Sequence, residues 1–179
     1  MENDSFCWYA MRVTYRRELL AKEELEGAGF RVFIPMVVEE REDPRSHKIK
    51  RVEVPAIHNL LFVYAEPSEL QLFKKDREYL QYLCTKAHTE VSRKIIIPDY
   101  QMDAFMQLYN NTDSQIIAPE NLLPGTPVRI IAGPFAGLTG TYQRVVGHRN
   151  RFFVISLNGL ISIGNTLIRP YMVQEIKEV

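Results

Sequence analysis

Short apolar runs separated by turn residues dominate the last third of the chain and constrain what it can fold into. From Leu123 onward, glycine, proline or asparagine interrupts the sequence every few residues, which leaves little room for a helix. The runs are rich in β-branched and aromatic residues and predict strands at 128–130, 141–146, 152–157, 161–163 and 171–176. Five small strands in about 55 residues indicate a closed antiparallel barrel, which leaves no open sheet edge.

A glycine-rich loop interrupts the first of these runs, in the segment RIIAGPFAGLTGTYQRV at 129–145. Its glycines can adopt positive φ or allow another backbone segment to approach closely, and its proline fixes the φ angle where the chain enters the loop. We therefore expect a tight reversal between two strands. A phosphate-binding loop is the rival interpretation. It fails because Thr141 and Tyr142 follow Gly140 where such a loop needs Lys and Ser/Thr, and no helix pattern comes next.

The residues before this module predict a separate α+β domain. Alternation at 7–14 indicates a strand with one buried face, and the continuously apolar run 59–65 indicates a central strand. Further strands are predicted at 30–38, 49–55 and 79–84, and helices at 16–28, at 67–75 and from the cap Asp99 to about 111. The predicted division is a domain at 1–111, a polar linker at 112–122 with an apolar patch at Ile116 and Ile117, and a second domain at 123–179.

Charge is balanced overall but unevenly distributed. The chain has 22 Lys and Arg against 22 Asp and Glu, which argues against a protein that coats nucleic acid by bulk electrostatics. From Leu123 onward six basic residues face two acidic ones, so the last third is basic and the rest acidic. This asymmetry indicates either separate partners for the two halves or surface arginines that serve solubility alone.

Catalytic, metal and membrane signatures are missing from the sequence. The four histidines are scattered along the sequence, and the two cysteines, Cys7 and Cys84, are too few for a disulfide framework. No Ser, Cys or carboxylate group has the spacing typical of a catalytic nucleophile and its general base. The longest apolar stretch, Leu60 to Ala65, is far shorter than the roughly 20 residues of a membrane span. From the opening Met-Glu-Asn-Asp we expect no secretory leader, because such a leader is basic and apolar. We therefore expect a cytoplasmic protein that is no enzyme and takes no cofactor or metal.

Two groups of segments resemble the NusG family. PGTPVRIIAGPFAGLTG at 124–140 resembles a KOW motif of the NusG type. Upstream, Trp8-Tyr9, the helix 16–28, FIPM at 33–36 and NLLFV at 59–63 follow the order and spacing of the NusG amino-terminal (NGN) domain. Trp8-Tyr9, FIPM and HNLLFV at 58–63 are most similar to the specialised RfaH and UpxY paralogues.

The resemblance implies an NGN domain, an antiparallel sheet flanked by helices, followed by a small all-β SH3-like KOW barrel. It implies a monomeric transcription elongation factor whose first domain binds the clamp helices of bacterial RNA polymerase beside the non-template DNA strand. Such a factor suppresses pausing and termination. UpxY-type relatives do so on surface or capsular polysaccharide operons. A ribosome-associated KOW protein that binds RNA is the alternative, and the acidic first domain argues against it.

The family's polymerase-facing patch corresponds to Ile57, Leu60 and Phe62. Aromatic residues often stand in the family where this chain has Ile57 and Leu60. Aliphatic side chains still contribute contact energy through buried apolar area, but the aromatic anchors are lost. Phe62 is predicted equally as core and as interface, whereas Leu60 is favoured as interface.

The DNA-binding residues are expected near the start of the first helix, at Arg12, Tyr15, Arg16 and Arg17. Guanidinium groups suit phosphates and an aromatic ring suits an unpaired base, although a solvated helix start has the same composition. The family's own basic pair lies at Thr14 and Tyr15, so the charge is displaced here. A second basic cluster, Arg45, Lys48, Lys50 and Arg51, faces acidic residues across a predicted hairpin and is interpreted as self-paired.

In the second domain, the match to the family's partner-binding residues is weaker. In the family Rho or a ribosomal protein docks on an apolar strip, whose aromatic positions correspond here to Leu138 and Asn158. Their loss argues against Rho. The expected KOW loop comprises Gly133, Pro134, Phe135, Gly137, Leu138 and Gly140. Nascent RNA is a further candidate partner, through Arg144, His148, Arg149 and Arg151.

Overall fold

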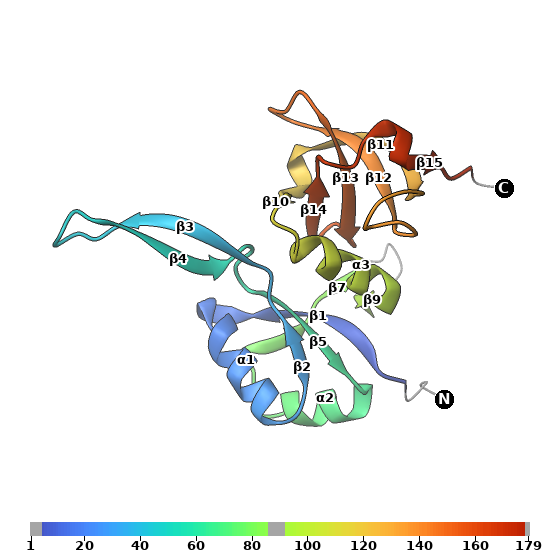
Figure 1. The fold of residues 1–179 in the computed structure, drawn as a ribbon. Helices are drawn as coiled ribbons and strands as arrows, with labels where there is room; N and C mark the ends of the chain where they lie inside the picture. The colour runs from blue at the N-terminus through green and yellow to red at the C-terminus, as the bar shows by residue number, and fades with distance from the viewer. Residues whose placement is uncertain (1–4, 86–91, 178–179) are drawn as a thin grey trace. The chain divides into compact units, whose positions relative to one another are not determined.

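The computed structural model describes residues 5–85 and 92–177, which divide by their internal contacts into two compact units (Figure 1). The first unit spans 1–98 and the second 99–179. Each unit has its own sheet. The predicted division at 111 stays a prediction, but the contact boundary falls between Pro98 and Asp99 and places the third helix with the second unit.

The first unit is built on an antiparallel sheet with the order β2-β5-β1-β6, to which β9 adds beside β1. Ladder pairs such as Ala10 with Phe62 set the register of the two central strands. A small separate ladder joins β7 to β8. The strands are β1 (Cys7–Val13), β2 (Arg31–Phe33), β5 (Leu60–Ala65), β6 (Leu80–Tyr82), β7 (Cys84–Thr85), β8 (Arg93–Lys94) and β9 (Ile96–Ile97).

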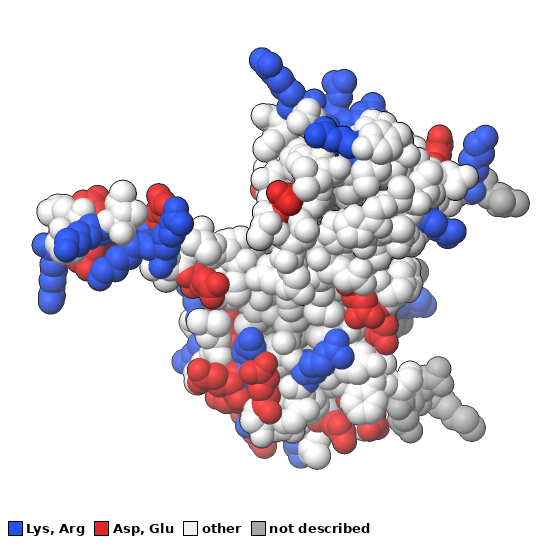
Figure 2. All heavy atoms as spheres, viewed as in Figure 1, with Lys and Arg blue, Asp and Glu red and all other residues white. Residues whose placement is uncertain are grey.

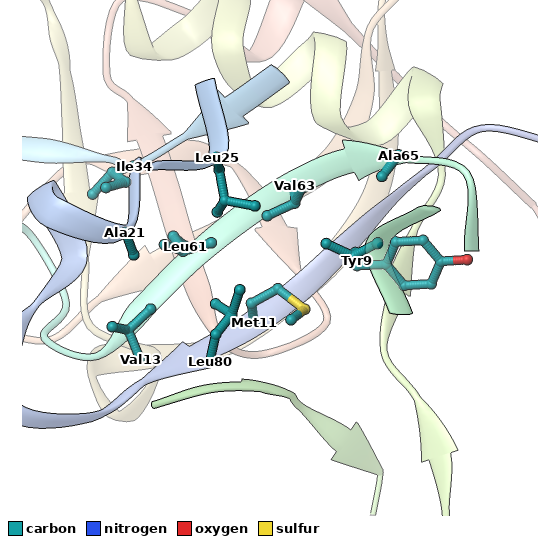
Figure 3. Packing of buried hydrophobic residues seen from close by; sticks show 11 residues of the cluster. Tyr9, Met11, Val13, Ala21, Leu25, Ile34, Leu61, Val63, Ala65 and Leu80 are labelled. Carbon is teal, nitrogen blue, oxygen red and sulfur yellow. The ribbon is translucent and has the colours of Figure 1, made fainter. Parts of the chain in front are cut away.

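Two helices, α1 (Glu18–Gly27) and α2 (Pro67–Lys74), provide the cover for one face of this sheet. Pro67 lies in the first turn of α2. A backbone N–H at this position would have no intrahelical partner, so the helix loses no hydrogen bond to the proline. Alternate residues of β1 and β5 converge with apolar side chains of the helices in one buried cluster (Figure 3). The cluster consists of Tyr9, Met11, Val13, Ala21, Leu25, Ile34, Leu61, Val63, Ala65, Leu70 and Leu80.

The opposite face of the sheet is also apolar. The intervening residues of the two central strands include Trp8, Ala10, Leu60 and Phe62, all of them buried. Aromatic contacts run along this face, with Phe33 and Phe62 6.5 Å apart between ring centroids. A strand that is apolar on both faces reads as a continuous hydrophobic run, which is why 59–65 shows no alternation in the sequence.

A long hairpin of β3 (Met36–Glu42) and β4 (Ile49–Pro55) projects from the first unit (Figure 1). Pro35 separates β3 from β2, so the strand predicted at 30–38 is divided in two. Two of the four basic residues expected to pair within the hairpin do so: Arg51 Nε lies 3.2 Å from Glu40 Oε1, and Lys50 Nζ 2.7 Å from Asp43 Oδ2. Among the described residues Arg45 and Lys48 form no ion pair. The Lys50 hydrogen bond, with backbone amides of the turn, lowers the pKa of Asp43.

The second unit consists of α3 (Asp99–Tyr109) and a six-stranded antiparallel sheet with the order β10-β14-β13-β12-β11-β15. Gln101 Nε2 of α3 donates to the Ser156 carbonyl oxygen of β13 over 2.6 Å. The strands are β10 (Ser114–Ile117), β11 (Leu122–Ile130), β12 (Thr139–Val145), β13 (Arg151–Leu157), β14 (Ile161–Asn165) and β15 (Val173–Glu175). Among the described residues β10 and β15 share no ladder, so the closed SH3-like barrel stays a prediction.

The segment predicted as a linker, 112–122, contains an edge strand. β10 pairs along β14, and Ile117 is buried with Val145, Phe152 and Val154. The apolar patch recognised at Ile116 and Ile117 is therefore part of a strand that completes the second sheet. The sequence did not predict this strand because it is short and has polar flanks. Strand propensity also depends on the strand with which a segment pairs, which the sequence does not show.

The glycine-rich loop between β11 and β12 reverses as predicted. Gly137 N–H donates to the Ile130 carbonyl over 2.8 Å, and Gly137 adopts a φ of +95°. Gly140 has a different requirement. A Cβ there would lie 2.5 Å from the Val154 carbonyl oxygen and 2.8 Å from the Phe153 ring. Gly140 thus allows β12 and β13 to approach closely.

We predict that Gly140→Ala destabilises the second unit by about 2 kcal/mol, because the backbone of β13 cannot move aside cheaply. Chemical denaturation followed by circular dichroism measures it. Gly27→Ala is the matched control: its Cβ meets nothing within 4 Å at the end of α1, so stability should stay equal or rise slightly. Equal stability of the two variants would contradict the close approach.

Candidate nucleic-acid interface

The turn between β1 and α1 has an unusual backbone. Tyr15 and Arg16 adopt φ of 61° and 53°, the left-handed region that residues with a Cβ seldom occupy. Each such residue costs on the order of 1 kcal/mol, so the surrounding structure must impose the conformation. The result is that the Tyr15 side chain stands 83% exposed at the surface.

Hydrogen bonds to Asn59, the residue before β5, hold this turn. The Arg16 N–H donates to Asn59 Oδ1 over 3.3 Å, and the Val13 N–H donates to the Asn59 carbonyl over 3.1 Å. Asn59, itself left-handed at φ 64°, donates its own N–H to the buried Glu18 carboxylate. The residue before β5 thus fastens the end of β1 to the start of α1, and the strained backbone becomes a fixed feature.

An open groove of about 770 Å³ begins at this turn and runs along the segment after α2. Arg17 lies between two tyrosines, its Cζ 5.6 Å from the ring centroid of Tyr15 and 5.8 Å from that of Tyr79. Cationic and aromatic groups alternate along a single strand's path in proteins that bind unpaired nucleic acid. The lining residues are Thr14, Tyr15, Arg17, Lys75, Asp76, Arg77, Glu78, Tyr79 and Gln81.

Hydrogen bonds from Tyr79 and Arg77 to Glu24 of α1, together called the Glu24 buttress, hold one wall of the groove. Tyr79 donates its hydroxyl to Glu24 Oε2, and Arg77 Nε donates to the same oxygen over 3.0 Å. The Tyr79 hydrogen bond, followed by the one from Arg77, lowers the pKa of Glu24. Burial, together with the carboxylate, raises the pKa of Tyr79. Arg77 is thereby paired with a carboxylate, whereas Arg17 and Lys75, the other two cations that line the groove, form no ion pair within 4 Å among the described residues.

The structure brings together two of the four predicted DNA-binding residues. Tyr15 and Arg17 line the groove, while Arg12 and Arg16 are exposed but do not line it. Arg12 lies on β1 opposite Leu60. Sequence reasoning missed Lys75, Arg77 and Tyr79. Their signal was a KKDREY run at 74–79, but only the tertiary fold shows that it lies beside the first helix.

The predicted polymerase patch lies elsewhere on the first unit. Ile57 is half-buried in the loop before β5, whereas Leu60 is 4% and Phe62 0% exposed, on the sheet face opposite α1 and α2. The role of these residues as a contact surface stays a prediction. In this structure Leu60 and Phe62 are shielded from solvent.

Positions predicted to meet a second partner lie in turns of the second unit. Leu138 and Phe135 are half-buried in the glycine-rich loop, and Asn158 is exposed in the β13–β14 turn with φ 48°. Their partner contacts stay predictions. A left-handed turn residue explains why asparagine stands at 158, because asparagine tolerates positive φ better than an aromatic residue.

Two other kinds of site are absent from the part of the chain that the structure describes. No three His, Cys, Asp or Glu side chains there form a group able to hold a metal ion. Nor does any helix of these residues combine the length and apolarity that crossing a bilayer requires.

Comparison with known proteins gives one family. The family model described as transcription termination factor NusG matches residues 6–106, more than half of the chain. The match contains the groove and the β5 strand and ends within α3. No curated protein matches. A solved structure described as the MjSpt4:Spt5 complex, conformation B, aligns with 96% of this chain and 97% of its own at 16% identity, and its TM-score of 0.27 is too low to establish a shared fold.

The Glu24 buttress predicts a pH dependence. A carboxyl whose pKa is lowered in the folded state stabilises it above the unfolded pKa, and this contribution is lost as pH falls through the folded value. Glu24→Gln should therefore lower the free energy of unfolding by less than about 1 kcal/mol near neutral pH, since the pair is a third exposed. The difference from the unsubstituted protein should shrink in urea titrations as the pH falls below the ordinary range of a glutamate pKa, because the stabilising carboxylate becomes protonated. A difference independent of pH would contradict it.

The groove predicts single-stranded DNA binding that depends on the ring and the cations. Tyr15→Asn removes the ring but tolerates the left-handed backbone, and it should raise the Kd about fivefold or more. Arg17→Ala with Lys75→Ala should weaken binding further and reduce its salt dependence. Fluorescence anisotropy with an oligonucleotide measures both. Lys22→Ala, a cation of α1 outside the groove, is the control, and an equal loss there would mean that charge alone binds DNA.

Proposed function

This chain belongs to the NusG family of transcription factors, and we propose that it binds RNA polymerase and acts on transcript elongation as an operon-specific antiterminator of the RfaH or UpxY type. The first unit would bind the clamp helices, and its groove would hold the displaced non-template strand. The second unit, a KOW domain in this proposal, would meet a further partner. The protein would act as a cytoplasmic monomer without catalysis of its own, and capsular or other surface polysaccharide operons are the proposed targets.

The groove at the β1–α1 turn is the observation that carries this proposal. Its backbone is held in a strained conformation that places Tyr15 outward beside Arg17. Strain of this kind is retained where a function requires the geometry. An aromatic ring beside cations fits an unpaired strand, which a transcription bubble provides.

Polymerase binding would use the apolar sheet face that carries Leu60 and Phe62. An apolar strand face can fill the groove between two helices, and its contribution scales with buried area at roughly 25 cal/mol per Å². Because both side chains are shielded in the structure, the face has to become exposed when polymerase binds. Ile57, half-buried in the loop before β5, would contribute to the same contact.

The absence of aromatic residues at Leu138 and Asn158 supports antitermination over recruitment of Rho. Hot spots at protein interfaces are most often aromatic or arginine anchors. A half-buried leucine and a polar turn residue provide neither. In vitro transcription across a candidate operon leader tests this directly: the protein should increase read-through, and Rho should not reverse that increase.

The polymerase surface can be tested with two neighbouring leucines of β5. Leu60→Ala and Leu61→Ala remove the same atoms from opposite faces of one strand, and both are buried. Each should destabilise the unit by about 2–5 kcal/mol. Only Leu60→Ala should also raise the Kd for polymerase core, by tenfold or more, measured by biolayer interferometry under conditions where both variants are folded. Equal affinities would place the contact elsewhere.

A further inference from the structure

We propose that the path of a single DNA strand over the first unit does not end at the groove but continues past α2 to a second phosphate-binding site. Lys74 of α2, Tyr82 of β6 and Lys94 of β8 form this second site, called the Tyr82 site. The inference rests on the proposed function, in which the groove holds the displaced strand. It goes beyond that function because it lengthens the path and assigns a role to three residues outside the groove.

The ring of Tyr82 gathers two lysine side chains from different elements. Lys94 Nζ lies 4.3 Å and Lys74 Nζ 5.6 Å from the centroid of the ring. An aromatic ring attracts ammonium groups within about 6 Å, which offsets part of the repulsion between two cations. Tyr82 is half-buried and packs against the core, with its ring 5.4 Å from that of Tyr9 between centroids. The core therefore holds the ring that positions the two lysines.

Backbone hydrogen bonds keep Lys94 beside Tyr82. The Ile95 N–H donates to the Leu83 carbonyl over 2.8 Å, so the residues that follow Lys94 and Tyr82 in the chain are joined directly. The Ile95 carbonyl in turn accepts the Ala10 N–H over 3.1 Å. The segment that carries Lys94 is thus fastened to the central strand β1, and the Tyr82 site does not depend on a loose surface side chain alone.

No carboxylate pairs with these lysines within the described ranges 5–85 and 92–177. Lys74, Lys75 and Lys94 form no ion pair there. The β3–β4 hairpin differs, because Figure 2 shows acidic side chains among its basic ones where Figure 1 places it, and several of its cations are in ion pairs. The lysines near Tyr82 therefore retain charge that an anionic ligand can use.

Open depressions connect the Tyr82 site to the groove. One of about 600 Å³ extends to Lys74 and Tyr82 and shares four lining residues with the groove, namely Lys75, Arg77, Glu78 and Gln81. Another of about 610 Å³ lies along α2 and joins Lys75 to Lys94. Lys75 lines all three depressions. The cations of the groove and of the Tyr82 site therefore border one continuous path.

A flexible polyanion fits this path better than a small anion or a folded acidic protein. A single strand carries one phosphate per nucleotide, so cations spread along a path can bind it in succession. A small anion would occupy one site and gain nothing from the continuity. A rigid acidic surface would meet Asp76 and Glu78 in the middle of the path, whereas a strand can turn its phosphates toward the lysines.

The test measures binding of a labelled 4-nucleotide and a labelled 12-nucleotide oligothymidine to the full chain by fluorescence anisotropy. Lys74→Ala with Lys94→Ala should raise the Kd of the longer strand about tenfold and lower its slope of log K against log salt by about 1.4, at about 0.7 for each phosphate contact. The shorter strand cannot occupy the groove and the whole Tyr82 site together, so its Kd should change less than about twofold.

The role of the ring is tested at Tyr82 itself. Tyr82→Leu keeps an apolar side chain against the core but removes the ring, and it should raise the Kd of the longer strand about threefold. Tyr82→Phe retains the ring and should bind like the unsubstituted protein. Circular dichroism confirms that both variants are folded. Equal affinity of the leucine and phenylalanine variants would show that the ring does not position the lysines.

The matched control is Arg45→Ala with Lys48→Ala, which removes two cations of the same unit that form no ion pair among the described residues. It should leave the Kd of the longer strand within about twofold. The proposal is overturned if this control weakens binding as much as Lys74→Ala with Lys94→Ala, if the latter weakens both strands equally, or if poly-glutamate of the same charge binds as tightly as the longer strand.

The groove variant Arg17→Ala with Lys75→Ala separates this inference from the proposed function. If it leaves the affinity for both strands unchanged, the DNA groove of the proposed function is wrong. If it weakens both while Lys74→Ala with Lys94→Ala binds the longer strand normally, the groove stands and only its continuation to the Tyr82 site is wrong.

Discussion

The antiparallel pairing of β1 with β5 is the constraint on which the first unit depends. A slip of one residue would exchange the two faces of one strand relative to the other, so the side chains that pack with α1 and α2 fix the register. That register also places Asn59, just before β5, beside the end of β1. From there its backbone and side chain hold the left-handed turn at Tyr15 and Arg16. Core packing therefore determines the geometry of the surface turn at Tyr15 and Arg16.

Periodicity and turn residues were enough to predict most helices and strands, because these elements follow local patterns. The helix at 67–74 begins at its proline, and the uninterrupted run at 60–65 is a central strand. Two features depend on tertiary neighbours and escaped the sequence. Pro35 divides one predicted strand, and β10 finds its partner only through Ile117 in a core shared with distant residues. The predicted linker is for this reason partly a strand.

Only part of the candidate groove could be predicted from the sequence, for a similar reason. Tyr15 and Arg17 stand out in the sequence as an aromatic residue among cations. Lys75 and Tyr79 are some sixty residues away in the chain, and the opposing wall exists only because Glu24 receives hydrogen bonds from Tyr79 and Arg77. No local pattern reveals positive φ at a tyrosine. Arg12, predicted with the cluster, belongs to the strand ladder and lies outside the groove.

The projecting β3–β4 hairpin has a consequence for the protein in a crowded cell. Within the described residues it is a sheet of two strands, so both of its long edges present backbone amides and carbonyls with no neighbouring strand. Bare edges of this kind template fibrils and other strand-exchanged assemblies. Here both strands of the hairpin carry many charged side chains, several of them in ion pairs. A second chain that added a strand to either edge would first have to remove water from these charged groups. The charges that pair within the hairpin thus also protect it from self-association.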